Sequence, residues 1–282
     1  MLRLLLQELR FRRNAIIGWA IGLTFLPAIY VGIYPQFEAE LAGMQAILDL
    51  EIYQAMGMSF GTFEDWIAST VINIVPILVA IYAVMDGTGT LAGEEESGKL
   101  ELIVALPIPR WQIVTVKAIA HGIALFLILL LVSISTTIVF LAIESQIETT
   151  LAATDVLWGL LYAWPIVMAF GMISLFLGAF APRRRTGALI STVIVVVSYF
   201  GSNLSSQVST LESLQPLFLF HYLDATAGLF ETGPQTNDVL TLLTIALIAF
   251  IWSVVFFQLR DITVGAWPWQ RGKMPADATQ SG

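Results

Sequence analysis

The chain has 282 residues, of which 57% are hydrophobic and only 12% are charged. Because soluble domains carry about 25% charged residues, this composition indicates a protein whose main solvent is lipid. The absence of cysteine excludes disulfides, thiolate catalysis and cysteine-based metal sites, and two distant histidines argue against a histidine metal cluster. The net charge of −8 argues against nucleic acid as a partner.

Six stretches without Asp, Glu, Lys or Arg define the expected architecture. Each holds roughly 20 residues or more, enough for a helix to cross a hydrocarbon core about 30 Å thick. Unpaired backbone groups are costly in lipid, so helices rather than strands are expected. The sequence therefore predicts one all-α polytopic membrane domain over residues 1–282, with six transmembrane helices. The approximate spans are residues 14–37, 66–85, 118–143, 156–182, 187–211 and 239–259.

Residues 1–13 precede the first span and combine leucines with arginines. The leucines fall on one helical stripe, which comprises Leu2, Leu5, Leu6 and Leu9. This pattern predicts an amphipathic interfacial helix on the cytoplasmic surface rather than a signal peptide.

Small residues and prolines mark special positions inside the spans. Gly18 and Gly22 form a GxxxG pattern, which either marks a close helix contact or occurs by chance. Pro76 in the second span and Pro165 in the fourth predict kinks, since proline interrupts helical hydrogen bonding.

The basic residues predict the orientation. They lie only at the two chain ends and around the second and fourth connections: Arg3, Arg10, Arg12, Arg13, Lys99, Arg110, Lys117, Arg183, Arg184, Arg185, Arg260, Arg271 and Lys273. By the positive-inside rule, both termini are expected in the cytoplasm, which agrees with an even number of spans.

Residues 213–223, SLQPLFLFHYL, are apolar but only half as long as a span. This length suits a re-entrant or interfacial helix in the last outer connection. The segment is either an anchor at the membrane surface or a gate that places His221 at an outer vestibule.

Residues 93–100, GEEESGKL, match all but the last position of an ATP-binding P-loop. The position after Lys99 is leucine, so the Ser or Thr that would bind magnesium is missing. Three glutamates would repel a triphosphate, and a membrane helix rather than a strand precedes the segment. We therefore expect no nucleotide site here. The residues alone suit either a solvated connection or a short amphipathic helix that binds a partner.

The wider pattern around this segment resembles the cytoplasmic signature of ABC-2 type permeases. The matching residues are Glu95, Glu96, Gly98, Lys99, Leu100, Glu101, Pro107, Arg110 and Lys117. The interfacial first helix, the six spans and the short apolar segment before the last span also resemble that family. Pro109 is a small departure, since small polar residues are common at its position.

The resemblance implies the membrane subunit of an ATP-binding cassette transporter rather than an enzyme, in a prokaryotic plasma membrane. ATP and magnesium would bind a separate ATPase subunit, with no cofactor in this chain, and a second permease subunit would complete a homodimer or heterodimer. Residues 93–110 would form the coupling helix. Its expected ATPase-coupling residues are Glu94, Glu95, Glu96, Gly98, Lys99, Glu101, Pro107 and Arg110.

The cargo pathway is expected to be mostly apolar. Its polar candidates for a pathway or gate are Asn73, His121 and His221. An apolar pathway suits export of a hydrophobic or amphipathic compound, such as a drug, an antibiotic or a lipid. The alternative is a secondary transporter or membrane scaffold that needs no ATPase, although the sequence shows few of the intramembrane charges and broken helices typical of secondary transporters.

Overall fold

The computed structural model describes residues 1–48, 62–98, 108–206 and 208–259, and within them every regular element is helical. Six helical segments in this part of the chain are long and apolar enough to cross a membrane. They are Leu2–Glu38, Phe63–Glu96, Arg110–Gln146, Ala153–Phe180, Arg184–Ser205 and Thr236–Leu259. The prediction of an all-α protein with six spans is confirmed.

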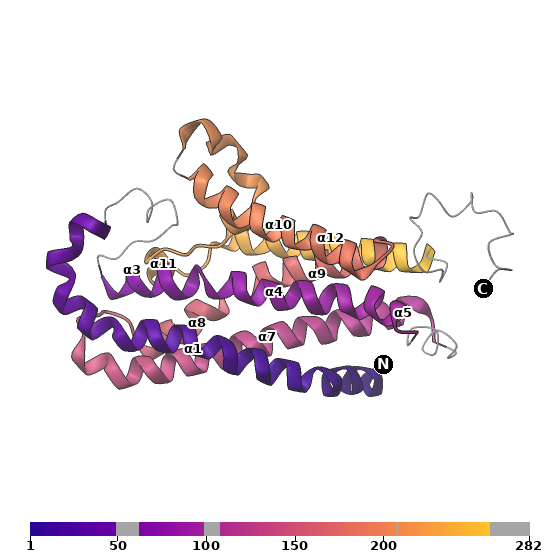
Figure 1. Cartoon of the computed structure of the whole chain (residues 1–282), viewed down its shortest axis with the longest axis horizontal. Coiled ribbons are helices and arrows are strands. Elements are labelled where there is room, and N and C mark those ends of the chain that lie inside the picture. The colour runs from indigo at the N-terminus through magenta and orange to yellow at the C-terminus, as the bar shows by residue number, and fades with distance from the viewer. Residues whose placement is uncertain (49–61, 99–107, 207, 260–282) are drawn as a thin grey trace, which may run out of the picture.

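The elements follow one another along an elongated bundle (Figure 1). The α-helices are α1 (Leu2–Leu48), α3 (Phe63–Ile67), α4 (Val75–Thr88), α5 (Glu94–Glu96), α7 (Arg110–Ile143), α8 (Ala153–Leu161), α9 (Trp164–Phe180), α10 (Arg184–Ser205), α11 (Gly228–Thr232) and α12 (Thr236–Leu259). Two π-helices, η1 (Ala68–Ile72) and η2 (Gly89–Gly93), lie on either side of α4. The 3₁₀-helices are η3 (Glu144–Gln146), η4 (Ser209–Leu217) and η5 (Leu219–Tyr222).

Helices α4 and α9 form the centre of the bundle, with α1 and α7 on one side and α10 and α12 on the other (Figure 1). Glycines let the two central helices approach closely. A Cβ atom on Gly87 would lie 2.8 Å from Cβ of Ser174, and one on Gly178 would lie 3.1 Å from Cα of Thr88. Because lipid provides no hydrophobic drive for helix association, close backbone packing of this kind holds membrane helices together.

The GxxxG pattern of α1 has a different environment. A Cβ atom on Gly18 or Gly22 would meet no heavy atom within 4 Å. Within the described part of the chain, this face of α1 is therefore open rather than packed on another helix.

Both expected proline kinks are confirmed. The second span changes from η1, which ends at Ile72, to α4, and the fourth changes from α8, which ends at Leu161, to α9. A proline ring clashes with the carbonyl four residues before it. For Pro76 and Pro165 these carbonyls belong to Ile72 and Leu161, where the preceding helices end.

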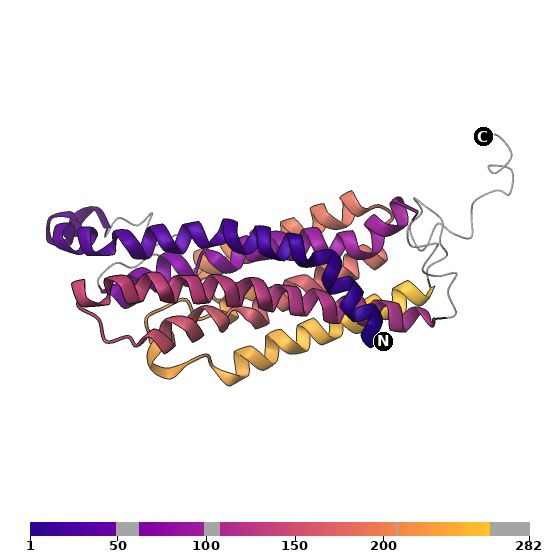
Figure 2. The ribbon, with the colours of Figure 1, turned by 90° about the horizontal axis from the view of Figure 1, so that it is seen from below.

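The expected interfacial helix, residues 1–13, is continuous with the first span in α1. Figure 2 shows that its first turns bend away from the axis of the rest of the helix. Its side chains divide between two environments: Leu2 is 70% exposed, whereas Arg12 is buried. One of the expected surface arginines thus points into the protein.

The apolar segment at residues 213–223 forms 3₁₀-helical turns of η4 and η5 instead of one α-helix. Phe220 is buried, with its ring centroid 5.5 Å from that of Phe170 and 5.2 Å from that of Tyr199. Its backbone N–H donates to Oγ of Ser198 at 3.1 Å. Since Ser198 lies seven residues before the end of α10, the segment folds back about 10 Å along that helix.

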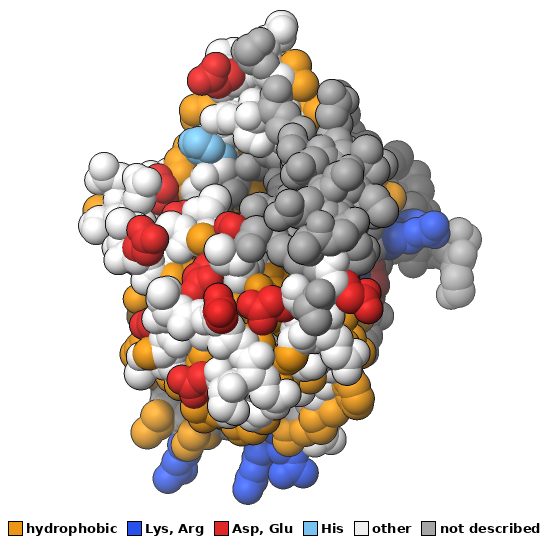
Figure 3. Space-filling model, turned by 90° about the vertical axis from the view of Figure 1, so that its left-hand side faces the viewer, with side chains coloured by type: hydrophobic (Ala, Val, Ile, Leu, Met, Phe, Trp, Pro, Cys, Tyr) orange, Lys and Arg blue, Asp and Glu red, His pale blue; other side chains and the backbone are white. Residues whose placement is uncertain are grey.

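Acidic side chains gather at the end of the bundle that carries α3 and α11 (Figure 3). One of them joins two connections at this end: Oε1 of Glu64 accepts hydrogen bonds from Oγ1 of Thr149 at 2.9 Å and from the N–H of Thr150 at 2.9 Å. The loop before α8 is thereby fixed to the start of the second span.

The close contact between α4 and α9 predicts different effects for two glycine substitutions. We expect Gly87→Ala to lower the free energy of unfolding by about 1–3 kcal/mol, because the added methyl overpacks the contact with α9. The matched control, Gly18→Ala, adds the same methyl to an open face and should leave stability unchanged or slightly raised. Thermal unfolding in detergent measures both. Equal melting temperatures for the two variants would contradict the close packing.

Candidate functional site

The expected coupling segment begins where the second span ends, at α5. Among its expected residues the structure describes Glu94, Glu95, Glu96, Gly98 and Arg110, whereas Lys99, Glu101 and Pro107 lie outside the described residues. Gly98 has a positive φ of 72°, and its N–H donates to the carbonyl of Glu95 at 3.0 Å. Glycine takes this left-handed conformation without steric cost, so it ends the short helix.

The glutamates of α5 are engaged within this chain. A carboxylate oxygen of Glu94 lies 2.7 Å from Nζ of Lys117 on α7. A carboxylate oxygen of Glu96 accepts a hydrogen bond from the backbone N–H of Arg184 at 2.7 Å. Glu95 is buried, with 5% of its surface exposed. The segment is thus attached to two other helices.

Lys117 joins α5 to α1. Its side chain is only 1% exposed, and its Nζ also lies 2.9 Å from Oε1 of Glu8. Glu8 in turn pairs with Arg12, four residues later on the same helix. An ammonium group has three donors, and two of them meet carboxylates here.

Arg12 joins α1 to the second span. Its Nε lies 3.0 Å from Oδ2 of Asp86, and its Nη2 donates to Oγ1 of Thr90 at 2.8 Å. Asp86 also contacts His121 of α7, with 2.6 Å between Oδ2 and Nδ1. These contacts form one continuous set, which we call the ion network. Its members are Glu8, Arg12, Asp86, Thr90, Glu94, Lys117 and His121.

Mutual pairing makes the ion network tolerable in a largely buried place. The carboxylates of the network pair with the cations Arg12 and Lys117, and the imidazole of His121 contacts the carboxylate of Asp86. Removing charges from water costs several kcal/mol per ion unless each has a close partner. The ends of α1, α4 and α7 are therefore fixed relative to one another and to α5.

His121 also fixes the distance between α7 and α9. The side chain is fully buried, and a Cβ atom on Gly171 would lie 2.5 Å from its Nε2. Only a glycine on α9 leaves room for the ring. His121 therefore belongs to the ion network and also packs against the central helix α9.

The three expected pathway or gate residues do not converge. Asn73 is buried where η1 ends, 13 residues before Asp86 and hence about 20 Å away along the helix. His121 belongs to the ion network, and His221 is exposed on η5 beside Tyr222.

Sequence reasoning missed Glu8, Arg12 and Asp86 as members of a site. A signal was nevertheless present, since polar residues repeat every four positions at one end of three helical segments. The repeating residues are Glu8 and Arg12; Asp86, Thr90 and Glu94; and Lys117 and His121. Each set lies on one face of its helix.

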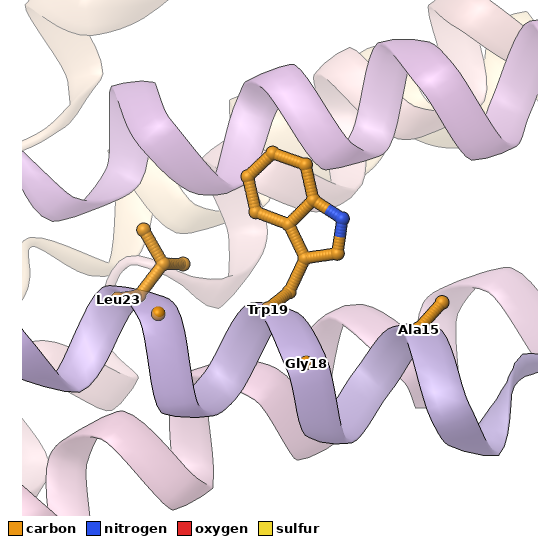
Figure 4. Close-up of a pocket in the computed structure, with 5 residues that line it drawn as sticks. Ala15, Gly18, Trp19 and Leu23 are labelled. Atoms are coloured by element: carbon orange, nitrogen blue, oxygen red, sulfur yellow. The ribbon is translucent and has the colours of Figure 1, made fainter.

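Helix α1 carries two apolar openings. One, of about 340 Å³, is lined by Ala15, Gly18, Trp19, Gly22 and Leu23 (Figure 4). In it Trp19 points from α1 toward α4, where its ring lies 5.8 Å from that of Tyr82. The other, of about 510 Å³, lies between α1 and Leu131 of α7. Their linings offer few polar groups that could orient a polar ligand.

Comparison with known protein families shows which family the chain resembles over most of its length. A family model described as ABC-2 family transporter protein matches residues 2–262, which include all six helical spans. A search of curated proteins gives no match.

The ion network predicts a large effect of losing its central cation. We expect Lys117→Met to lower the free energy of unfolding by about 3–5 kcal/mol, because two carboxylates then lose their shared partner. Adding Glu94→Gln should recover part of this loss, since it removes one unpaired charge. Thermal unfolding in detergent measures the cycle. Arg185→Met, at an exposed position, is the control, and equal losses for Lys117→Met and this control would contradict the network.

Proposed function

This chain belongs to the ABC-2 family of transporter proteins and is a multi-pass membrane permease subunit, and from this we propose that a separate ATP-binding cassette ATPase subunit drives it. Permeases of this family generally work with such a subunit. One observation carries the proposal: the end of the second span, at α5, is attached by charged contacts to helices on two sides. A displacement of α5 would therefore be transmitted to α7 and α10 as well as to the second span.

In this proposal, residues 93–110 dock on the ATPase and follow its closure when ATP binds. Movement of Glu94 pulls Lys117 and thus α7, and the pair of Lys117 with Glu8 passes the movement to α1. Arg12 and Asp86 link α1 back to α4. Such coupling requires that the ATP-bound partner favour one of two permease conformations.

ATP and magnesium would bind the partner rather than this chain. In place of a strand and a phosphate-binding loop, the structure has a π-helix at Gly89–Gly93 followed by the helix Glu94–Glu96. Two of the three glutamates point to cationic or N–H groups of this chain. Arg110, at the start of α7, and the segment outside the described residues would complete the docking surface.

The proposed orientation places both termini in the cytoplasm of a prokaryotic cell. The described basic residues belong to the first turns of α1, the start of α7 and the start of α10. The acidic residues of α3, η3 and α11 gather at the opposite end (Figure 3). This asymmetry supports the positive-inside orientation in the plasma membrane.

We propose that the cargo is a hydrophobic or amphipathic compound, such as a drug, an antibiotic or a lipid, and that it is exported. Support comes from the few polar groups that the spans offer. Oγ1 of Thr136 donates to the carbonyl of Val132 at 2.8 Å, and Oγ of Ser174 donates to that of Phe170 at 2.7 Å. These hydroxyls are engaged by their own helices and present little polarity to a cargo.

A second permease subunit, identical or related, is the further expected partner. The GxxxG face of α1 is open in the single chain, which supports packing of another helix against it. Two-fold pairing of identical subunits is the commonest arrangement for oligomers.

A secondary transporter that needs no ATPase is the competing proposal, and the buried charges of the ion network are the observation that raises it. Buried charges in membrane proteins often form ion or proton pathways. In this chain, however, they lie at one end of the bundle, and Arg12 and Lys117 are each paired with two carboxylates. This arrangement fits a mechanical joint better than a pathway across the membrane.

Copurification tests the ATPase partner. Gentle purification from the native membrane, followed by mass spectrometry, should identify a stoichiometric subunit with a complete G-x-x-x-x-G-K-[ST] motif. Simultaneous replacement of Glu95, Glu96 and Glu101 by alanine should release that subunit and abolish transport. A reproducible preparation without an ATPase, in a detergent that preserves known ABC complexes, would favour the secondary transporter.

Cysteine labelling tests the orientation, since the natural chain has no cysteine. Ser145 in η3 and Ser97 after α5 are both exposed and lie at opposite ends of the bundle. In intact cells, an impermeant maleimide should label the Ser145→Cys variant at least about tenfold more than the Ser97→Cys variant, as the positive-inside rule requires. Permeabilised cells provide the control, because both variants should then react. The reverse preference would place the termini outside.

A further inference from the structure

We propose that Glu96 and Arg184 form a second mechanical connection, through which α5 moves α10 and the outer segment packed on it. This inference rests on the proposed ATP-driven function and adds a route separate from the ion network. The ion network joins α1, α4, α5 and α7, whereas this connection joins α4, η2 and α5 to α10. We call it the α10 latch, made of Gly89, Gly93, Glu96 and Arg184.

The first contact of the latch is a helix cap provided by another helix. Arg184 is the first residue of α10, and the N-cap residue Arg183 makes no side-chain cap. The first N–H groups of a helix have no partner within that helix, and the helix dipole favours a negative charge there. The carboxylate of Glu96 meets both needs, with 2.7 Å between its Oε1 and the N–H nitrogen of Arg184.

The second contact holds the Arg184 side chain against η2. Its Nη2 donates to the carbonyl of Met85 at 3.2 Å. A Cβ atom on Gly89 would lie 3.1 Å from Nη2, and one on Gly93 would lie 3.1 Å from Cδ. Because these glycines are four residues apart, they line one face of the helix. Because they lack side chains, the exposed arginine can lie directly against the backbone of this helix.

The two contacts lie on opposite sides of a π-helix. Met85 precedes η2, and Glu96 follows it. In a π-helix the backbone hydrogen bonds join residues five apart instead of four. Such turns are uncommon and often occur at functional positions. Any rearrangement of η2 changes the separation of Met85 and Glu96. Arg184 then has to move with one of them, and α10 follows.

Helix α10 connects the latch to the other end of the protein. Its 22 residues span about 33 Å, from Arg184 to the turns that pack on its outer part. There, Gly201 accommodates the ring of Phe218, and Ser198 accepts the N–H of Phe220. Movement of the latch therefore reaches η4 and η5, and we infer that this outer segment responds to ATP through α10.

Electron paramagnetic resonance on the copurified complex in nanodiscs tests the latch. One spin-label pair, at Leu214 on η4 and Ile138 on α7, reports on the outer segment, and both positions are exposed. A second pair, at Ser97 and Leu259, reports on α5 relative to α12, which lies outside the ion network, and both positions are exposed. ATP with magnesium should change both distances in the otherwise natural sequence.

Two variants should separate the two routes. Arg184→Gln and Gly89→Ala should reduce the ATP-induced population of the moved outer state by about tenfold, since each loosens the contact of the arginine side chain with η2. ATP hydrolysis and the change in the Ser97–Leu259 pair should persist. Arg185→Gln, which removes the same charge from the neighbouring and likewise exposed position, is the matched control and should retain both changes.

The outcomes distinguish the latch from the function on which it rests. A full outer response in both variants, or no outer response in the natural sequence while the inner pair moves, would overturn the latch and leave the ATP-driven function standing. Absence of an ATPase, or of any ATP response at either pair, would overturn the proposed function itself. If Arg184→Gln fails to fold, Gly89→Ala decides, because it keeps both charged groups.

Discussion

The need to pair buried charges governs one end of this protein. Lys117 is almost fully buried, and two carboxylates from different helices surround its ammonium group. Separating either of them would leave an uncompensated charge in a poorly hydrated place, which costs far more than an exposed ion pair contributes. The ends of α1, α4, α5 and α7 consequently behave as one body, and rearrangement has to occur at its borders.

The contacts between this charged end and the rest of the bundle depend on close backbone packing at glycines rather than on ion pairs. Helices α4 and α9 approach so closely at Gly87 and Gly178 that side chains cannot be inserted between them, and Gly171 leaves the space that His121 fills. Glycine also lines the contact between η2 and Arg184. Where small residues permit close approach, helices can slide or rotate only together with their neighbours. The charged body and the α10 side of the bundle therefore meet along a glycine-lined surface.

Most of the architecture could be predicted from the sequence, because the spans and their breaks depend on the composition of short stretches of the chain. Charge-free length predicted the six spans, and Pro76 and Pro165 predicted the two breaks. The partners within the site were not accessible in this way. Arg12 was expected on an interfacial helix, among the basic residues that predict the orientation, yet it points inward to Asp86, 74 residues later. Such pairings depend on how helices are arranged in space, and a periodicity of four shows only which side of a helix is polar. The packing of Phe218 and Phe220 of η4–η5 on α10 is likewise a contact between segments that local patterns do not reveal.

The composition of the ion network has a consequence for biosynthesis. All of its members lie between residues 8 and 121, in the part of the chain that leaves the ribosome first. The charges of α1 can therefore find their partners once the beginning of α7 has been made, before α9, α10 and α12 exist. This order of synthesis shortens the time during which the buried charges have no partners.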